Sequence, residues 1–137
     1  MKTIWCLALL VVLFLTTGVC AAEIPDLRGN WSGHWSMYYM AEGYSESTEN
    51  GSITASFAEQ KDRIFNGNLI FKEENRPDFK TGFAGAIGLD NMTFYMAEFD
   101  EGYALGTLIS NDEMEVLYLA DGDNTSVVID RLYRIKE

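Results

Sequence analysis

The stretch GNWSGHWSMYYM, residues 29–40, decides the fold class of this chain. Trp31, Trp35 and Tyr39 fall on one parity of the stretch, and small or polar residues such as His34 lie between them. Apolar and polar side chains that alternate with a period of two are typical of a β-strand with one buried face. We therefore predict a β-strand over these residues.

Comparable stretches recur roughly every dozen residues and end at turn residues, which gives eight predicted strands in all. The seven others are expected at residues 52–60, 63–72, 78–88, 92–99, 103–110, 113–120 and 125–135. The interval 41–50 is expected to be the longest loop, and the Asp and Gly residues at 121–124 predict a hairpin turn. Eight antiparallel strands on short hairpins predict an all-β, single up-and-down barrel, because closure of the sheet removes its exposed edges.

Two other all-β architectures are less consistent with the pattern. A jelly-roll sandwich would need longer crossover connections than the sequence offers. An outer-membrane barrel would need a polar lumen and longer strands, with an apolar outer belt flanked by aromatic residues. The up-and-down barrel is therefore the prediction carried forward.

Residues 1–22 are predicted to be a signal peptide, and residues 23–137 the barrel domain. Lys2 gives a short positive start, residues 4–15 are an apolar run, and the small residues of Cys20-Ala21-Ala22 favour cleavage after Ala22. The run is shorter than the roughly 20 residues of a membrane span. The expected location is secreted or extracytoplasmic, and membrane-anchored if the leader is retained.

Cysteine content and charge exclude several classes of function. Both cysteines, Cys6 and Cys20, lie in the predicted leader, so the domain would hold no disulfide, thiol nucleophile or thiolate metal site. The chain carries a formal charge of −11, and loss of Lys2 leaves 9 basic against 21 acidic residues, or −12. Such a charge argues against nucleic acid as a partner.

Leu27-x-Gly29-x-Trp31, at the start of the first strand, resembles the opening motif of the calycins, which include lipocalin, fatty-acid-binding and avidin-like barrels. The resemblance implies that Gly29 and Trp31 form a structural plug at one end of the barrel. It also implies that a basic residue at the end of the last strand, Arg131 or Arg134, packs over the indole. In lipocalins a long first loop covers the open end, and residues 41–50 match that position.

The resemblance and the aromatic content together predict a lumen that binds one small, mostly apolar molecule. The predicted ligand-binding residues are Trp35, Met37, Tyr39, Phe57, Phe83, Phe94 and Tyr118, with the two tyrosines as polar handles. Gly33, Gly67 and Gly85 share the apolar parity of their strands and are expected to leave space among the rings. The alternative is a barrel plugged by its own side chains, which acts as a structural domain, binds a cell-surface protein or forms oligomers.

No motif in the sequence predicts an enzyme, a cofactor or a metal centre. His34 lies on the polar face of its strand and has no nucleophile or orienting carboxylate in a catalytic pattern. The acidic residues at 100–101 and 121–123 fit turns, and their spacing matches no calcium loop. Four Asn-x-Ser/Thr sequences are glycosylation candidates, at Asn30, Asn50, Asn91 and Asn124.

Overall fold

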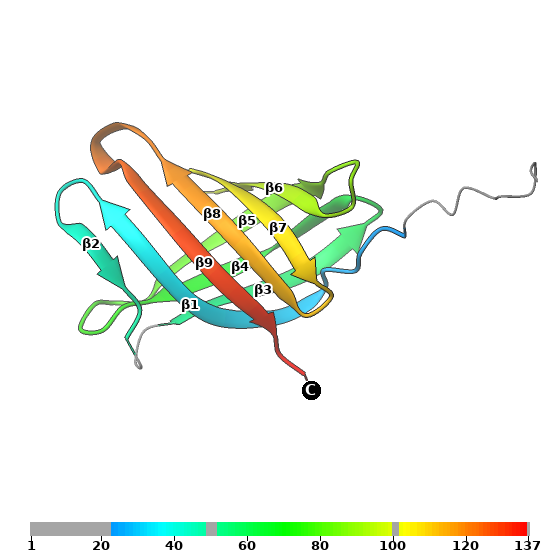
Figure 1. Ribbon diagram of the computed structural model, residues 1–137, viewed down its shortest axis with the longest axis horizontal. Helices are drawn as coiled ribbons and strands as arrows, with labels where there is room; N and C mark the ends of the chain where they lie inside the picture. The colour runs from blue at the N-terminus through cyan, green and yellow to red at the C-terminus, as the bar shows by residue number, and fades with distance from the viewer. Residues whose placement is uncertain (1–22, 49–51, 100–101, 137) are drawn as a thin grey trace, which may run out of the picture.

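The computed structural model describes residues 23–48, 52–99 and 102–136. The strands are β1 (Gly29–Tyr39), β2 (Gly43–Glu46), β3 (Ser52–Lys61), β4 (Ile64–Lys72), β5 (Phe79–Ile87), β6 (Thr93–Glu98), β7 (Tyr103–Ser110), β8 (Glu113–Ala120) and β9 (Ser126–Arg134). All of them except β2 form a closed antiparallel barrel, in which β9 pairs back onto β1 along residues 31–39 (Figure 1). The predicted all-β, eight-stranded barrel is confirmed.

Strand β2 was not predicted, because its residues lie within the stretch expected to be a loop. It pairs with the second half of β1, from Ser36 to Tyr39. The first half of β1 pairs with β3 instead, and that pairing ends at Gly33. The segment 43–46 is too short and too polar to show an alternation in the sequence. Within the described residues the one helical element is a 3₁₀ turn, Gly122–Asn124, and none is long and apolar enough to cross a membrane.

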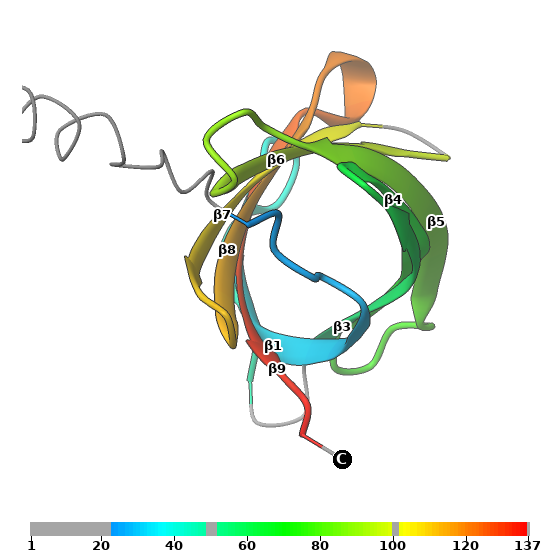
Figure 2. The same cartoon turned by 90° about the vertical axis from the view of Figure 1, so that its right-hand side faces the viewer.

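The end of the barrel near Trp31 is closed by the segment that precedes β1, which crosses the opening in Figure 2. The Arg134 guanidinium lies 4.2 Å from the centroid of the Trp31 ring. It also donates hydrogen bonds to the carbonyl oxygens of Arg28 (2.7 Å) and Asp26 (2.8 Å). The Trp31 indole N–H donates to the carbonyl of Leu27 at 3.0 Å. One arginine thus covers the tryptophan and ties the first residues of the domain to its last strand.

Arg131 does not take part in this plug. Its guanidinium lies 3.5 Å from the Glu113 carboxylate and 3.3 Å from that of Glu115, on the outer face of the sheet. Arg131 and Arg134 are three residues apart on one strand, so alternation sends their side chains to opposite faces. Of the two arginines named from the sequence, Arg134 therefore stacks on Trp31 and Arg131 does not.

A bulge in β3 positions a second side chain that holds the crossing segment at the same end of the barrel. The register with β4 shifts between Phe57 and Glu59, so that Gln60 is half-buried while Glu59 is exposed. The Gln60 amide accepts a hydrogen bond from the backbone N–H of Leu27 and donates one to the carbonyl of Pro25, both at 2.8 Å. The crossing segment is therefore held from both sides of the barrel.

The half of the interior next to the plug is filled by phenylalanine rings. Phe57 contacts Phe65, Phe83 and Phe94 at centroid distances of 5.4, 5.1 and 6.4 Å. Edge-to-face and tilted contacts of this kind stabilise aromatic clusters beyond simple burial. This part of the lumen is a packed core.

Phenylalanine rings occupy the space beside two of the inward-facing glycines. The expectation that these glycines leave free space in the lumen was therefore wrong. A Cβ at Gly67 would overlap the ring of Phe83, and a Cβ at Gly85 would overlap the ring of Phe65. Gly33 has another role, because a Cβ there would overlap the carbonyl group of Arg131 on β9. It permits the close approach of the two strands that close the barrel.

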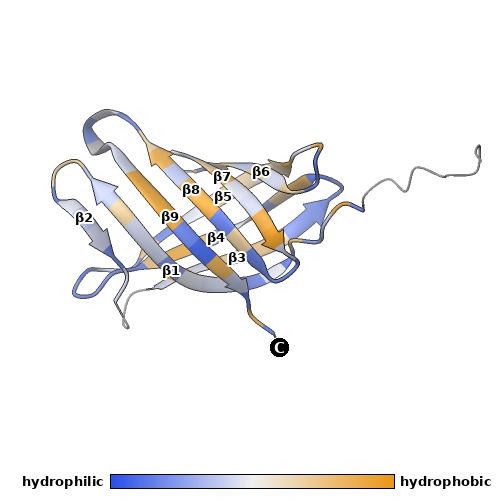
Figure 3. Cartoon of the chain, in the orientation of Figure 1, coloured by the Kyte–Doolittle hydropathy of each residue, from blue (hydrophilic) through white to orange (hydrophobic). Residues whose placement is uncertain are grey.

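Two rows of apolar side chains cross the outside of β7, β8 and β9. Tyr103, Leu119 and Val127 are aligned by the strand register, and so are Leu105, Leu117 and Ile129 in the neighbouring row. Five of these six side chains are exposed, and Leu117 is half-buried. Figure 3, which colours each residue by its hydropathy, shows orange apolar segments on β7, β8 and β9. Contiguous exposed apolar surface of this kind is common at contact sites.

We predict that Arg134→Ala lowers the free energy of unfolding by about 2 kcal/mol, since it removes a cation–π contact and charged hydrogen bonds to two carbonyls. Arg131→Ala is the matched control, because its ion pairs are solvent-exposed and each contributes about 0–1 kcal/mol. Urea unfolding followed by tryptophan fluorescence measures both. Equal losses in the two variants would contradict the assignment of Arg134 as the fastening residue.

We also predict that Gly106→Ala destabilises the domain by about 1–3 kcal/mol, because the new methyl group overlaps the ring of Phe94. Phe94→Leu should cost less in the Gly106→Ala background than in the wild type, because the smaller side chain makes room for the methyl group. A double-mutant cycle from urea unfolding measures this coupling. Additive losses would show that the ring and the glycine do not compete for the same space.

Candidate functional site

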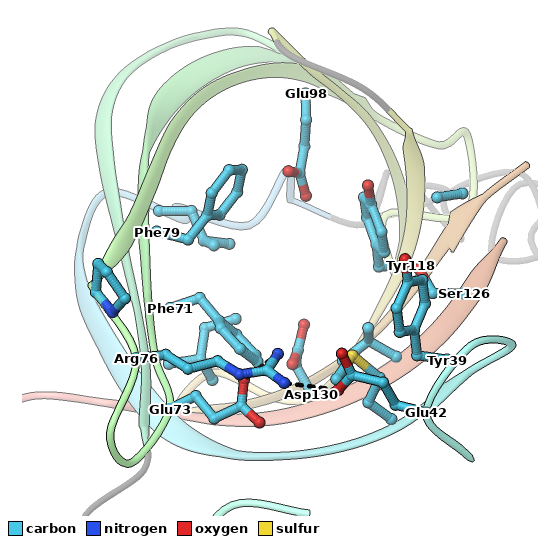
Figure 4. Close-up of a pocket in the computed structure, with 16 residues that line it drawn as sticks. Tyr39, Glu42, Phe71, Glu73, Arg76, Phe79, Glu98, Tyr118, Ser126 and Asp130 are labelled. Atoms are coloured by element: carbon cyan, nitrogen blue, oxygen red, sulfur yellow. Dashed lines mark hydrogen bonds and ion pairs between the residues drawn. The ribbon is translucent and has the colours of Figure 1, made fainter. Parts of the chain in front are cut away.

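A cavity of about 490 Å³ occupies the end of the barrel opposite Trp31. Its walls come from the C-terminal ends of β1, β4, β6 and β8 and the N-terminal ends of β3, β5 and β9, all at one rim of the barrel (Figure 4). The phenylalanine cluster lies beyond it, toward the plug. The lumen is therefore divided into a filled half and a hollow half.

The cavity wall is mainly apolar. The apolar side chains that line it are Met37, Ile53, Leu69, Phe71, Pro77, Phe79, Ala120 and Val128. Phe71 packs against Trp35 at a centroid distance of 4.7 Å, and the Trp35 indole N–H donates to the carbonyl of Lys72 at 3.3 Å. This contact fixes one wall between β1 and β4.

Asp130 places a carboxyl group inside this apolar wall. It lies on β9 between Val128, which also lines the cavity, and Leu132, which belongs to the core, so it marks the inner limit of the cavity on that strand. The residue is 4% exposed, and its Oδ1 atom has no hydrogen-bond partner among the residues that the structure describes. Buried polar atoms nearly always have a partner, so this oxygen requires an explanation.

The surroundings of Asp130 raise its pKa from 3.8 to about 8. Burial is the larger cause, because a low-dielectric environment disfavours the charged form. The negative charge of Glu98, which projects into the lumen from β6, is the second cause (Figure 4). Near neutral pH the Asp130 carboxyl is thus mostly protonated.

The mouth of the cavity carries a small ion-pair network. Arg76, in the loop between β4 and β5, lies 2.6 Å from the carboxylate of Glu42 and 3.1 Å from that of Glu73. Glu42 belongs to the turn between β1 and β2, so this contact joins two loops across the rim. The side chains of Arg76 and Glu42 are about half exposed and that of Glu73 is about a quarter exposed, so water screens these pairs. The network narrows the entrance without adding much stability.

Three of the seven predicted ligand-binding residues line the cavity: Met37, Tyr39 and Tyr118. The other four, Trp35, Phe57, Phe83 and Phe94, do not line it. They are buried in the core, where they pack on other aromatic rings. Parity identified them as inward-facing, but parity does not tell how far along the barrel the lumen is filled.

The remaining predicted positions lie away from the cavity. His34 and Asn30 are exposed on β1, Asn91 is half-buried in the turn before β6, and Asn124 is in the 3₁₀ turn. Asn50 is outside the described residues. In the described part of the chain, no three His, Cys, Asp or Glu side chains are placed to hold a metal ion.

The sequence prediction missed Asp130 and Glu98, although a signal for both was present. Asp130 shares the parity of Val128 and Leu132, and Glu98 shares that of Met96. A carboxylate on the apolar parity of a strand faces the interior, where it is costly unless it has a purpose. Attention to aromatic residues alone passed over these acids.

Comparisons with known proteins support the fold and go no further. No protein-family model matches the chain, and no curated protein sequence matches it significantly. Among solved structures, a redesigned β-barrel matches with a TM-score of 0.57 and 12% identity over 80% of this chain and 92% of its own. The S-type phycobiliprotein lyase CPES from Guillardia theta matches with a TM-score of 0.51 and 12% identity over 81% and 89%. At this identity the likeness is one of fold alone.

The raised pKa of Asp130 predicts how stability depends on pH. The unfolded chain releases this proton near pH 3.8 and the folded protein near pH 8, so folding weakens as pH rises between these values. Relative to Asp130→Asn, the free energy of unfolding of the wild type should fall by about 1.4 kcal/mol per pH unit in this window. Urea unfolding of both proteins across the window measures the difference.

Glu98→Gln refines the same measurement. Removal of the neighbouring charge lowers the pKa of Asp130, so the sloping window should end at a lower pH than in the wild type. Parallel curves for the wild type and Asp130→Asn would contradict the raised pKa of the aspartate.

Proposed function

We propose that this protein binds one small, mostly apolar molecule in the hollow half of its barrel. The observation that carries the proposal is the cavity of about 490 Å³ with a mainly apolar wall and a few polar groups that converge on it. Small-molecule sites typically measure about 300–1,000 Å³ and combine an apolar lining with a few placed polar groups. An eight-stranded barrel whose lumen was filled by its own side chains would offer no such space.

We further propose that the chain is an exported, calycin-like barrel. Gly29 and Trp31 at the closed end, with Arg134 stacked on the indole, support the resemblance to that superfamily. The structural likeness to other barrels is compatible with it. Cleavage after Ala22 and secretion remain predictions, because residues 1–22 are outside the described part of the chain.

A second candidate function is contact with another protein through the outer face of the barrel. The two exposed apolar rows across β7, β8 and β9 favour it, since they cover adjacent positions on three strands. A cell-surface partner or a second copy of the chain would bury them. This function does not require a ligand in the lumen.

Uptake of N-phenyl-1-naphthylamine, a neutral dye that fluoresces in apolar surroundings, tests the proposal. We expect saturable binding of one dye per chain. Ala120→Trp should weaken it by about tenfold or more, or roughly 1.4 kcal/mol, because the indole fills the cavity from its rim. Ala97→Trp, on the exposed outer face of β6, is the matched control and should bind as the wild type does.

The other outcomes separate the two candidates. Dye binding that Ala120→Trp leaves intact would place the dye outside the lumen and contradict the ligand proposal. Absence of dye binding, together with self-association in sedimentation, would favour the outer apolar rows as the functional surface.

A further inference from the structure

Asp130 lies in a part of the cavity wall where its nearest cross-strand neighbours are apolar. Its neighbours on the adjoining strands are Trp35 on β1 and Val116 on β8, and both are buried. A carboxyl group in such a position gives up its hydration, and Oδ1 gains no hydrogen bond from the described residues in return. The side chain projects into the cavity, as Figure 4 shows.

The charges around the cavity favour a positive ligand group. Arg76 is engaged at the mouth by Glu42 and Glu73, at 2.6 and 3.1 Å, so its charge is compensated there. Asp130 and Glu98 both line the cavity and face its space from nearly opposite walls. The charge of Glu98, together with that of Asp130 when its carboxyl is ionised, creates a negative potential in the cavity that attracts a cation and disfavours an anion.

We propose that the ligand of this cavity is an amphipathic amine, with a protonated nitrogen held by Asp130 in the electrostatic field of Glu98 and an apolar body against Phe71, Phe79 and Met37. This inference rests on the proposed ligand-binding function and names the chemical class of the ligand. A single nitrogen offers up to three hydrogen-bond donors and one positive charge. Those donors would give Oδ1 of Asp130 its partner, and the positive charge would favour the ionised form of the carboxyl.

Binding of an amine is linked to a proton on Asp130. The carboxyl is mostly protonated before binding, since its pKa is raised to about 8, and a cation beside it favours the ionised form. The ligand should therefore displace a proton near neutral pH. The other titratable or charged side chains that line the cavity are Tyr39, Glu42, Glu73, Arg76, Glu98 and Tyr118.

Three ligands that share one apolar body test the proposal: 1-naphthylmethylamine, 1-naphthalenemethanol and 1-naphthoate. Each competes with N-phenyl-1-naphthylamine at neutral pH, so that the naphthalene ring is constant while the head group is cationic, neutral or anionic. We expect the amine to bind at least about tenfold more tightly than the alcohol, and the carboxylate to bind most weakly. In Asp130→Asn the amine should lose about tenfold or more while the alcohol changes by less than about threefold.

Two further measurements separate a ligand contact from a structural role. Glu98→Gln should also weaken the amine selectively, whereas Glu115→Gln, which removes a carboxylate from the outer face of β8, should not. Affinity for the amine should rise with pH between about 6 and 8 in the wild type and stay flat in Asp130→Asn. These readouts would not move together if Asp130 acted only on folding.

The negative outcomes are distinguishable. If the dye binds and the amine shows no preference over the alcohol, the amine proposal is wrong and the ligand-binding function stands. Tighter binding of the alcohol would also overturn it, and would identify protonated Asp130 as a neutral hydrogen-bond donor. If the dye itself fails to bind, the underlying function fails.

Discussion

The pairing of β1 with β9 is the constraint on which the rest of the structure depends. It runs from Trp31 to Tyr39, and it turns a row of antiparallel hairpins into a closed barrel. Closure requires the two backbones to approach closely at Gly33, where a side chain would overlap the carbonyl of the opposing strand. The same pairing brings Arg134 over Trp31 and places Asp130 beside Trp35. The plug and the candidate site are therefore set by one strand pair.

The two halves of the lumen place opposite demands on the sequence. Near the plug, phenylalanine rings occupy the spaces left by glycines on neighbouring strands, so the interior is close-packed. Toward the mouth, the inward positions carry side chains that leave a cavity, and two of those positions are acids. The packed half supplies stability, and this permits the hollow half to hold a carboxyl group that weakens folding as it ionises. A buried carboxyl group that weakens folding has a reason to be kept in a ligand-binding site, and it has none in a purely structural core.

Much of the fold could be predicted from the sequence, because period-two alternation is directly readable in strands with one buried face. It located the eight barrel strands, and the first of them correctly pointed Trp31 and Trp35 inward. Strand β2 was not predicted, because four mostly polar residues are too few to show an alternation. The site was harder, since alternation tells which face a residue is on but not how the rings interlock along the barrel axis. Phe57 and Phe83 were therefore assigned to a cavity that lies elsewhere, and Asp130 was passed over.

The contacts at the closed end of the barrel limit which sequence changes the segment before β1 can accept. The Arg134 side chain and the Trp31 indole donate hydrogen bonds to main-chain carbonyls of the crossing segment. The Gln60 amide bonds to a main-chain carbonyl and a main-chain N–H of the same segment. These contacts therefore hold the segment by its backbone atoms and do not depend on its side chains. Side chains at positions 26 and 28 are exposed, and their replacement would leave these bonds in place. An insertion or deletion between Pro25 and Trp31 would instead move the carbonyls out of register with all three donors. Relatives of this protein should thus vary in residue identity across that segment while they keep its length.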